Sequence, residues 1–342
     1  MTQVTFFVGV DIASAAFMAC VGTAPWKLMV KPVKFDNHED GFASFLSWLK
    51  DHNLPPEKTV VCMEATGVYG EGLAYFLFAS GYTVSVEPPL NIQRKFPVNA
   101  SKTDELDCQY IAEYACRYQD KLAFWKPRAE ILEKVKVLLT TRQHFSVQLT
   151  GHKNALIAVN RKKVSSELAQ QVHQDMIEQI NKHIKAIDKE IRRLIDDDPN
   201  FKQTLLLLLS VPGIGLQLAA HLLILMQETV DPRVLAAFIG ICPFKHESGT
   251  SVYSAPTSRH YGPPVLRKLL YLGACSVRTH KKQFQQYFFR KVAEGKHKKI
   301  VLNNIENKIL KIACAVVRSQ KPYIPNYVSV NPLIFQKTLT AS

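Results

Sequence analysis

Short apolar runs alternate with amphipathic stretches over residues 1–120. The run TFFVGVDIA at residues 5–13 is almost continuously apolar, which is typical of a strand buried on both faces. Two more β segments are expected before residue 36, and a helix is expected over residues 39–52. Strands at residues 59–67 and 82–89 then alternate with helices over about 68–80 and 101–119. The order βββαβαβα predicts an α/β domain with an RNase H-like (RuvC-like) fold, in which the first and fourth strands are neighbours.

Residues 129–198 have a helical pattern without any strand signal. A heptad a/d seam is formed at spacings of three and four residues by Ile177, Ile180, Ile184, Ile187, Ile191 and Leu194. An apolar stretch at residues 132–139 is a candidate antiparallel partner for this seam. A hairpin within the chain and a coiled coil between two chains both satisfy the pattern, and the sequence leaves the two open.

Beyond residue 200 the chain is mostly helical. The segment LLSVPGIGLQLAAHLL at residues 207–222 predicts two helices joined by a tight turn, a helix-hairpin-helix. Gly213 and Gly215 in that turn would offer backbone N–H groups to a DNA phosphate, with an ordinary interhelical turn as the alternative. We therefore expect an α/β domain over residues 1–125, a helical coiled-coil region over 126–200, an all-α domain bearing a serine loop over 201–328 and a tail over 329–342.

Charge is distributed unevenly between these segments. The formal net charge is +14, yet acidic residues outnumber basic ones up to residue 125, so the whole positive excess lies beyond it. A strongly basic second part indicates a polyanionic partner, most commonly a nucleic acid, with a merely soluble basic surface as the alternative.

Cysteines and apolar runs exclude several other classes of protein. The seven cysteines form no CxxC pair, so neither a zinc site nor a disulfide framework is predicted. The N-terminus lacks the pattern of a secretory signal, and the apolar run at residues 205–209 is too short to span a bilayer. We expect a cytoplasmic protein that associates with the nucleoid and has no membrane partner.

Four carboxylates occupy positions that suit a metal site. Asp11 lies inside an apolar strand, where an unpaired charge is costly, and Glu64 ends a second buried strand. Asp104 and Asp107 are three residues apart and share one helical face. In the expected topology all four meet at one end of the sheet, where repulsion between them would be relieved by Mg²⁺ or Mn²⁺. For any single acid, a surface or salt-bridged carboxylate is the alternative.

A Ser-Gly-Thr-Ser segment lies within GICPFKHESGTS, residues 240–251. The local residues alone favour an ordinary loop, because Ser and Gly are common in loops and no His/Asp pattern accompanies Ser248. If Ser248 is a nucleophile, its activation has to come from elsewhere in the protein.

Basic and aromatic residues interleave from residue 259 to residue 311. That mixture suits contact with a DNA or RNA backbone, although core packing is the expected role of most of the aromatic residues. The candidate nucleic-acid contacts in this stretch are Arg259, Arg267, Lys268, Lys298 and Lys299.

Together these motifs resemble one family, the DEDD-type insertion-sequence transposases related to the Piv DNA invertase, which are bridge-RNA-guided recombinases. The resemblance covers residues 5–325 and depends on the order and spacing of VGVDIA, MEATG, SKTDELDC, SVPGIG, GICPFKHESGTS and LRKLLY. One departure is SRHYGPPVLRK, where Pro263 follows Gly262 in place of the Gly-Asn pair usual in the family.

The resemblance implies a mechanism that the residues alone do not. Asp11, Glu64, Asp104 and Asp107 would bind the metal, and Ser248 would form a covalent phosphoserine link to DNA. A non-coding bridge RNA would select donor and target DNA by base pairing. The active assembly would be a homo-oligomer, a dimer or a tetramer, in which the acidic domain of one subunit meets the serine domain of another.

Two other functions fit parts of the sequence. A RuvC-like Holliday-junction nuclease would use the same four acids with water as the nucleophile. A non-enzymatic, architectural DNA-binding protein accounts for the charge but leaves Asp11 unexplained.

Overall fold

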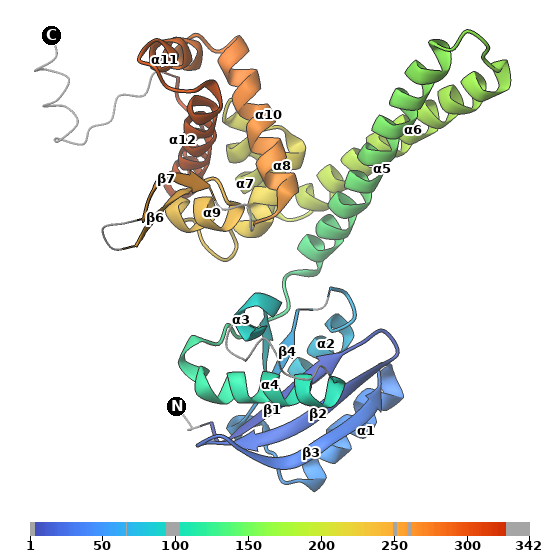
Figure 1. The fold of residues 1–342 in the computed structure, drawn as a ribbon, viewed down its shortest axis with the longest axis vertical. Coiled ribbons are helices and arrows are strands. Elements are labelled where there is room, and N and C mark those ends of the chain that lie inside the picture. Colours follow the sequence, from blue (N-terminus) through green and yellow to red (C-terminus); the bar gives the residue numbers. More distant parts are fainter. Residues whose placement is uncertain (1–3, 66, 94–102, 249–251, 259–261, 326–342) are drawn as a thin grey trace, which may run out of the picture. The chain divides into compact units, whose positions relative to one another are not determined.

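The computed structural model describes residues 4–65, 67–93, 103–248, 252–258 and 262–325. The chain divides into two compact units, Met1–Arg128 and Ala129–Ser342 (Figure 1). Each unit has its own hydrophobic core. The predicted division of the second unit into a coiled-coil region, a helical domain and a tail stays a prediction.

A five-stranded sheet forms the centre of the N-terminal unit. Its strands are β1 (Phe6–Ile12), β2 (Ala16–Thr23), β3 (Lys27–Asp36), β4 (Thr59–Glu64) and β5 (Thr83–Glu87), in the order β3-β2-β1-β4-β5. The first three strands are antiparallel, whereas β4 is parallel to β1 and β5 is parallel to β4. The first and fourth strands are therefore neighbours, as predicted.

Helices cover both faces of this sheet. Because alternate strand residues point to opposite faces, Val8 and Val10 pack in one core with α1 (Glu39–Asp51) and α2 (Glu71–Ala79). Phe7 packs on the other face with Ile111 of α4 (Asp104–Arg117). The shorter helical segments are α3 (Pro89–Gln93), η1 (Pro56–Lys58) and η2 (Gln119–Lys121). This arrangement confirms the predicted RNase H-like fold.

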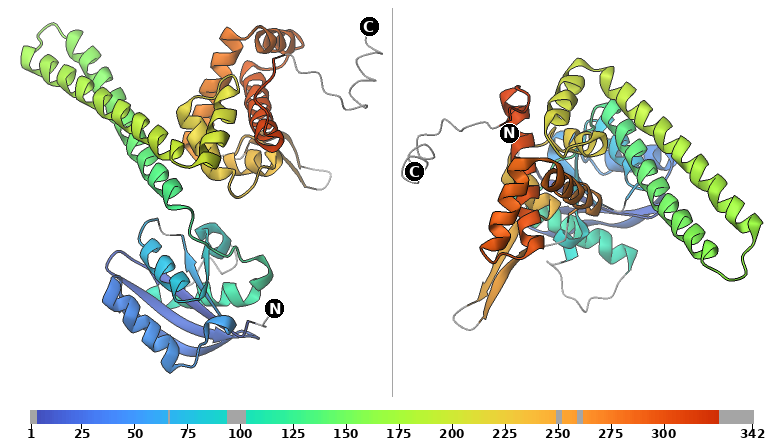
Figure 2. Two further views of the ribbon diagram at one scale, coloured as in Figure 1. Left: turned by 180° about the vertical axis from the view of Figure 1, so that it is seen from behind. Right: turned by 90° about the horizontal axis from the view of Figure 1, so that it is seen from above.

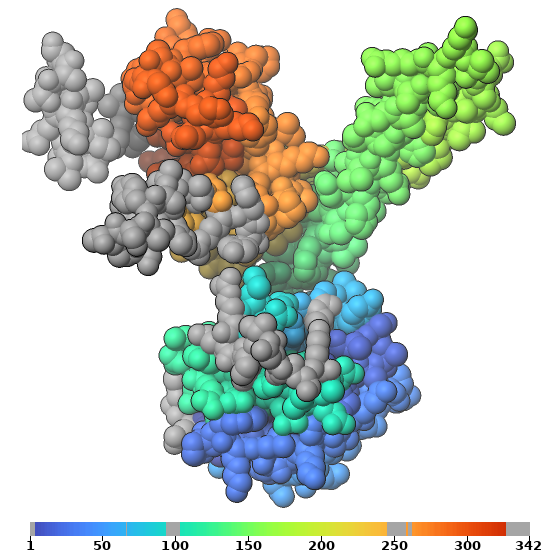
Figure 3. Space-filling model, viewed as in Figure 1, coloured from blue at the N-terminus to red at the C-terminus, as the bar shows by residue number. Residues whose placement is uncertain are grey.

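Two long helices begin the C-terminal unit. α5 (Glu130–Asn160) and α6 (Glu167–Asp196) lie side by side and antiparallel, and they make a hairpin within the chain (Figure 2). The space-filling view shows the hairpin extending away from the other helices of its unit (Figure 3). The predicted heptad seam faces α5, so the intramolecular alternative accounts for it.

The contacts between α5 and α6 are apolar at the base of the hairpin and include an ion pair further out. At its base Val135 and Ile191 are fully buried in the core of the unit. Further out, Arg142 makes a two-pronged ion pair with Asp188, with N–O distances of 2.6 and 2.9 Å. Paired and half-buried charges of this kind fix the register of two helices, because a shift by one turn would leave both uncompensated.

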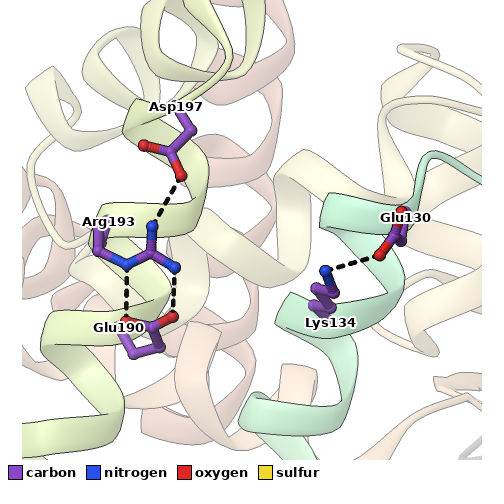
Figure 4. Close-up of polar contacts among 5 residues, drawn as sticks. All are labelled: Glu130, Lys134, Glu190, Arg193 and Asp197. Atoms are coloured by element: carbon purple, nitrogen blue, oxygen red, sulfur yellow. Dashed lines mark hydrogen bonds and ion pairs between the residues drawn. The ribbon is translucent and has the colours of Figure 1, made fainter.

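Ion pairs also lie on the exposed surface of the hairpin. Arg193 bonds to both Glu190 and Asp197, and Lys134 bonds to Glu130 at 2.6 Å (Figure 4). The hydrogen bond from Arg193 lowers the pKa of Glu190. These side chains are exposed to solvent and screened, so the pairs support their own helices and do not join α5 to α6.

Six further helices complete the unit within the described residues. They are α7 (Pro199–Ser210), α8 (Leu216–Leu225), α9 (Pro232–Ile239), α10 (Pro264–His280), α11 (Lys282–Ala293) and α12 (Lys298–Ser319). The break predicted at residues 243–264 contains a β-hairpin of β6 (Pro243–Ser248) and β7 (Val252–Ser258). The predicted tail after residue 328 lies outside the described residues. None of the described helices is long and apolar enough to cross a membrane.

The predicted turn between α7 and α8 packs tightly on α10. Gly213 has a left-handed backbone with φ of +87°, and a Cβ there would lie 3.0 Å from the carbonyl oxygen of Gly273. In the other direction, a Cβ on Gly273 would lie 2.4 Å from the carbonyl oxygen of Gly213. The two glycines therefore allow a backbone-to-backbone contact that no side chain would permit.

Replacing Ile184 and Ile187 by Lys should destabilise the hairpin without changing the mass of the assembly. Ile187 packs against the core, and burying an ammonium group there should cost on the order of 2 kcal/mol. Thermal unfolding and light scattering measure the two effects, and Lys185→Gln on the exposed side is the control. A smaller assembly with unchanged stability would contradict the intramolecular seam.

Gly273→Ala should destabilise the C-terminal unit by roughly 1–3 kcal/mol, because the new Cβ clashes with backbone atoms. Gly151→Ala is the matched control: Gly151 is exposed inside α5, and a Cβ there meets no atom within 4 Å. That control should gain up to about 1 kcal/mol from helix propensity. Urea unfolding followed by circular dichroism measures both, and equal stability of the two variants would refute the close contact.

Candidate functional site

Asp11 and Glu64 lie side by side at the carboxyl ends of two central strands. β1 and β4 are parallel, and their last paired residues are Val10 and Met63, so the two acids come next on each strand. By alternation they share the sheet face of Phe7 and Cys62, which is the face covered by α4. Both acids are half-buried.

The direction of α4 brings its first turn to the same end of the sheet. A Cβ on Gly9 would lie 2.1 Å from the carbonyl oxygen of Cys108, so α4 rests directly on β1 at this point. The Sγ of Cys116 lies 3.7 Å from the carbonyl oxygen of Thr23, beside the start of β1. α4 therefore runs antiparallel to β1, and its N-terminus lies at the end where β1 carries Asp11.

That N-terminus carries the other two predicted acids. Asp104 and Asp107 are in the first turn of α4, which Thr103 caps by accepting a hydrogen bond from the N–H of Leu106 at 3.3 Å. Asp104 is exposed and Asp107 is half-buried. The positive end of the helix dipole favours negative charge here, which partly offsets the repulsion among the acids.

Asp11 also acts electrostatically on the buried face of α4. The pKa of the Cys108 thiol is raised by its hydrogen bond to Cys20, by burial, and further by the charge of Asp11.

The four acids share one end of one face, but they are not a closed ligand shell. Among the described residues no three His, Cys, Asp or Glu side chains are grouped closely enough to hold a metal ion. Carboxylate oxygens in this set are nevertheless the ligands that hard divalent cations prefer. The chemistry of the donors fits a cation, and the assignment of these residues as ligands stays a prediction.

A fifth acid, Glu87, escaped the sequence analysis. It ends β5, directly beside Glu64 in the sheet register, and it is 2% exposed. Its carboxylate accepts hydrogen bonds from Ser85 at 2.9 Å and from the backbone N–H of Ala123 at 3.1 Å. Burial and the charge of Glu87 raise the pKa of Tyr114 to about 12. An acid at the end of a buried strand is the sequence pattern that could have identified Glu87. Because its carboxylate already accepts hydrogen bonds within the protein, we assign Glu87 a structural role.

Ser248 is not in a loop, as the sequence suggested, but is the last residue of β6. Its backbone pairs with Val252 of β7, across the tip of the β-hairpin. Ser251, the alternative nucleophile, lies outside the described residues. The strand was missed because its residues, PFKHES, show no apolar alternation.

The candidate nucleic-acid contacts fall into different environments. Gly213 is held against α10, whereas Gly215 directly precedes α8 and is open to solvent. The guanidinium of Arg267 donates to the carbonyl oxygens of Ile239 at 3.1 Å and Gly262 at 2.5 Å, so it joins α10 to the end of α9. Exposed positions on α10 and α12 are occupied by Lys268, Lys298 and Lys299. Arg259 lies outside the described residues.

Comparisons with known proteins agree with this order of parts. A family model described as a transposase, the DEDD domain of the IS110 group, matches residues 8–161. A second model, described as transposase IS116/IS110/IS902 family, matches residues 205–288. The pilin gene-inverting proteins of Moraxella lacunata and Moraxella bovis are 29% and 28% identical over 93% of this chain and 97% of their own length.

A solved structure of T. thermophilus RuvC in complex with a Holliday junction substrate matches with a TM-score of 0.29 and 11% identity, covering 35% of this chain and 99% of that one. The family assignment depends instead on the two sequence models and their order along the chain. The chain therefore belongs to the IS110 family of DEDD transposases and is a DNA transposase.

Proposed function

We propose that this transposase cuts and joins the DNA strands of an insertion sequence with a serine nucleophile and a divalent cation, Mg²⁺. The observation that carries the proposal is the placement of Asp11, Glu64, Asp104 and Asp107 at one end of one sheet face. A separate hairpin carries Ser248. The names of the Moraxella relatives, which invert a gene, support a reaction between two DNA sites.

The four acids would hold the cation. When bound, Mg²⁺ would polarise a phosphate oxygen and stabilise negative charge at the departing oxygen. The chain's own contribution is to orient the ligands: β1 and β4 fix Asp11 and Glu64, and the capped first turn of α4 fixes the other two acids. The β-sheet and α4 give the site a rigid base, which phosphate chemistry requires.

Ser248 would attack a DNA phosphorus. Its Oγ loses its proton and forms a bond to phosphorus, while the bond to the departing sugar oxygen breaks. That oxygen takes up a proton, so the proton count is unchanged. A serine hydroxyl is a weak nucleophile without a neighbouring base or metal. Ser248 and the acids lie in different units of the chain, so the proposed site is composite and neither unit alone should cleave DNA.

Nucleic-acid partners and assembly complete the proposal. The basic helices of the C-terminal unit would bind donor and target DNA and a non-coding guide RNA, in a dimer or tetramer in which one subunit's acids serve another's serine. Lys268, Lys298 and Lys299 are exposed and suited to phosphate contacts. The protein would then act in the cytoplasm on nucleoid DNA.

Asp11→Asn and Glu64→Gln should abolish strand cleavage, because each removes a ligand charge with little change of shape. DNA affinity should stay within about twofold of the wild type, and the free energy of unfolding within about 0.5 kcal/mol. Glu105→Gln is the matched control, since this exposed acid lies in the same turn of α4 but nearly opposite Asp107. Strand cleavage is measured with labelled donor DNA, guide RNA and Mg²⁺, and with chelator added. Cleavage that survives in the Asp11 variant would refute the metal site.

Ser248→Ala should bind nucleic acid normally but form no covalent protein–DNA adduct. The assay incubates wild type, Ser248→Ala and Ser251→Ala with donor DNA, guide RNA and Mg²⁺ and then resolves DNA-linked protein on a denaturing gel. Loss of the adduct only in Ser251→Ala would assign the nucleophile to Ser251. Cleavage by the wild type with no adduct in any lane would favour a junction nuclease that uses water.

A further inference from the structure

The helices α10, α11 and α12 meet in the C-terminal unit (Figure 1). A pocket of about 330 Å³ lies among residues of these helices. Two aromatic rings, two cations and two small polar groups line it, from Arg278, Thr279, Gln285, Phe288, Phe289 and Lys298. The volume is at the small end of the range for ligand sites, which suits one compact aromatic ligand with an anionic group.

The aromatic part of the pocket is already arranged for stacking. The guanidinium of Arg278 lies over the buried ring of Phe288, 5.3 Å from its centre. Phe289 meets Phe288 edge to face, with ring centres 5.7 Å apart, and is 61% exposed. An exposed phenyl ring beside a fixed one costs free energy in water, so a flat partner that covers Phe289 would be favoured.

The cationic part has no carboxylate partner among the described residues. Neither Arg278 nor Lys298 forms an ion pair there, and Arg278 donates a hydrogen bond to the hydroxyl of Thr279 at 3.3 Å. Of the two acids between residues 262 and 319, neither is ion-paired with Arg278 or Lys298 in the described structure. Glu294 bonds to Lys291 at 2.6 Å, and burial raises the pKa of Glu306 to about 7.

We propose that this pocket binds one unpaired nucleotide of a nucleic-acid strand, with the base against Phe289 and the phosphate between Arg278 and Lys298. The proposal rests on the proposed nucleic-acid function and names the ligand for one part of it. The amide of Gln285, which is exposed and at the pocket wall, can bond to the edge of the base.

A nucleic-acid duplex could not make the stacking contact that the pocket offers. Bases in a duplex are stacked on one another and only their edges and the phosphates are accessible, so Phe289 would stay uncovered. Single-stranded segments present both a free base face and a phosphate, and proteins bind them by combining aromatic stacking with basic side chains. The combination of an exposed ring and unpaired cations therefore distinguishes a strand from a duplex.

Phe289→Trp gives a direct readout of stacking in the full-length protein. The natural tryptophans, Trp26, Trp48 and Trp125, are all in the N-terminal unit, so the new indole alone reports on the pocket. Titration with a 20-nucleotide oligo(dT) or oligo(U) strand should quench this added fluorescence, after subtraction of the wild-type signal. A duplex of equal length should bind without the quenching.

Phe289→Ala should weaken binding of the single strand about 5- to 100-fold, as expected for loss of one stacked base. Phe289→Trp should retain it, and duplex affinity should not change in either variant. Phe238→Ala is the matched control, because Phe238 is also an exposed phenylalanine but lies on α9, away from the pocket lining. The ratio of oligo(U) to oligo(dT) affinity shows whether RNA or DNA supplies the nucleotide.

Three outcomes would overturn the proposal. The first is that the single strand binds Phe289→Trp without quenching its fluorescence, or binds Phe289→Ala as tightly as the wild type. Either result would mean that the strand is held by electrostatic contacts to its phosphates alone. Equal quenching by poly-glutamate would assign the pocket to an acidic protein partner. If the wild type binds neither single strands nor duplexes, the proposed nucleic-acid function fails together with the pocket. The first two outcomes would contradict only the pocket and not that function.

Discussion

The arrangement of the proposed catalytic acids depends on how closely α4 approaches the backbone of β1 at Gly9. A Cβ at this position would lie 2.1 Å from the carbonyl oxygen of Cys108 and 2.4 Å from the amide nitrogen of Ala112. Any other residue would push α4 away from the sheet, and the first turn of the helix would move with it. The distance between the acids of α4 and those of the strands is thus controlled by a missing side chain two residues before Asp11.

A comparable contact organises the C-terminal unit. Gly213 and Gly273 bring the turn between α7 and α8 against the backbone of α10, and Arg267 joins α10 to the end of α9. These contacts explain features that motif reasoning assigned to DNA. The left-handed glycine of the turn is required by packing, while Gly215, one position before α8, remains open for a phosphate.

The basic residues of this unit have two uses that the sequence does not separate. Some fix the fold: Arg142 pairs with Asp188, and Arg318 donates to the carbonyl oxygen of Val230 at 2.8 Å. Others, such as Arg278 and Lys298, face a pocket without a carboxylate partner in the described residues. A charge paired with a carboxylate, as that of Arg142 is, is largely cancelled at short range, whereas Arg278 and Lys298 add to the field that attracts a polyanion.

Apolar periodicity alone determined the order of strands and helices in the N-terminal unit, since a strand buried on both faces and an amphipathic helix leave different spacings. It also placed Asp11 inside the first buried strand and Glu64 at the end of the fourth. Three features became visible only in the tertiary structure. The helix α6 pairs with α5 of the same chain, and Ser248 ends a strand. The carboxylate of Glu87 accepts hydrogen bonds from inside its own unit. The bond between Glu87 and Ala123 joins residues far apart in the sequence, and Ser248 is in a strand because it pairs with Val252. Apolar periodicity holds no information about either contact.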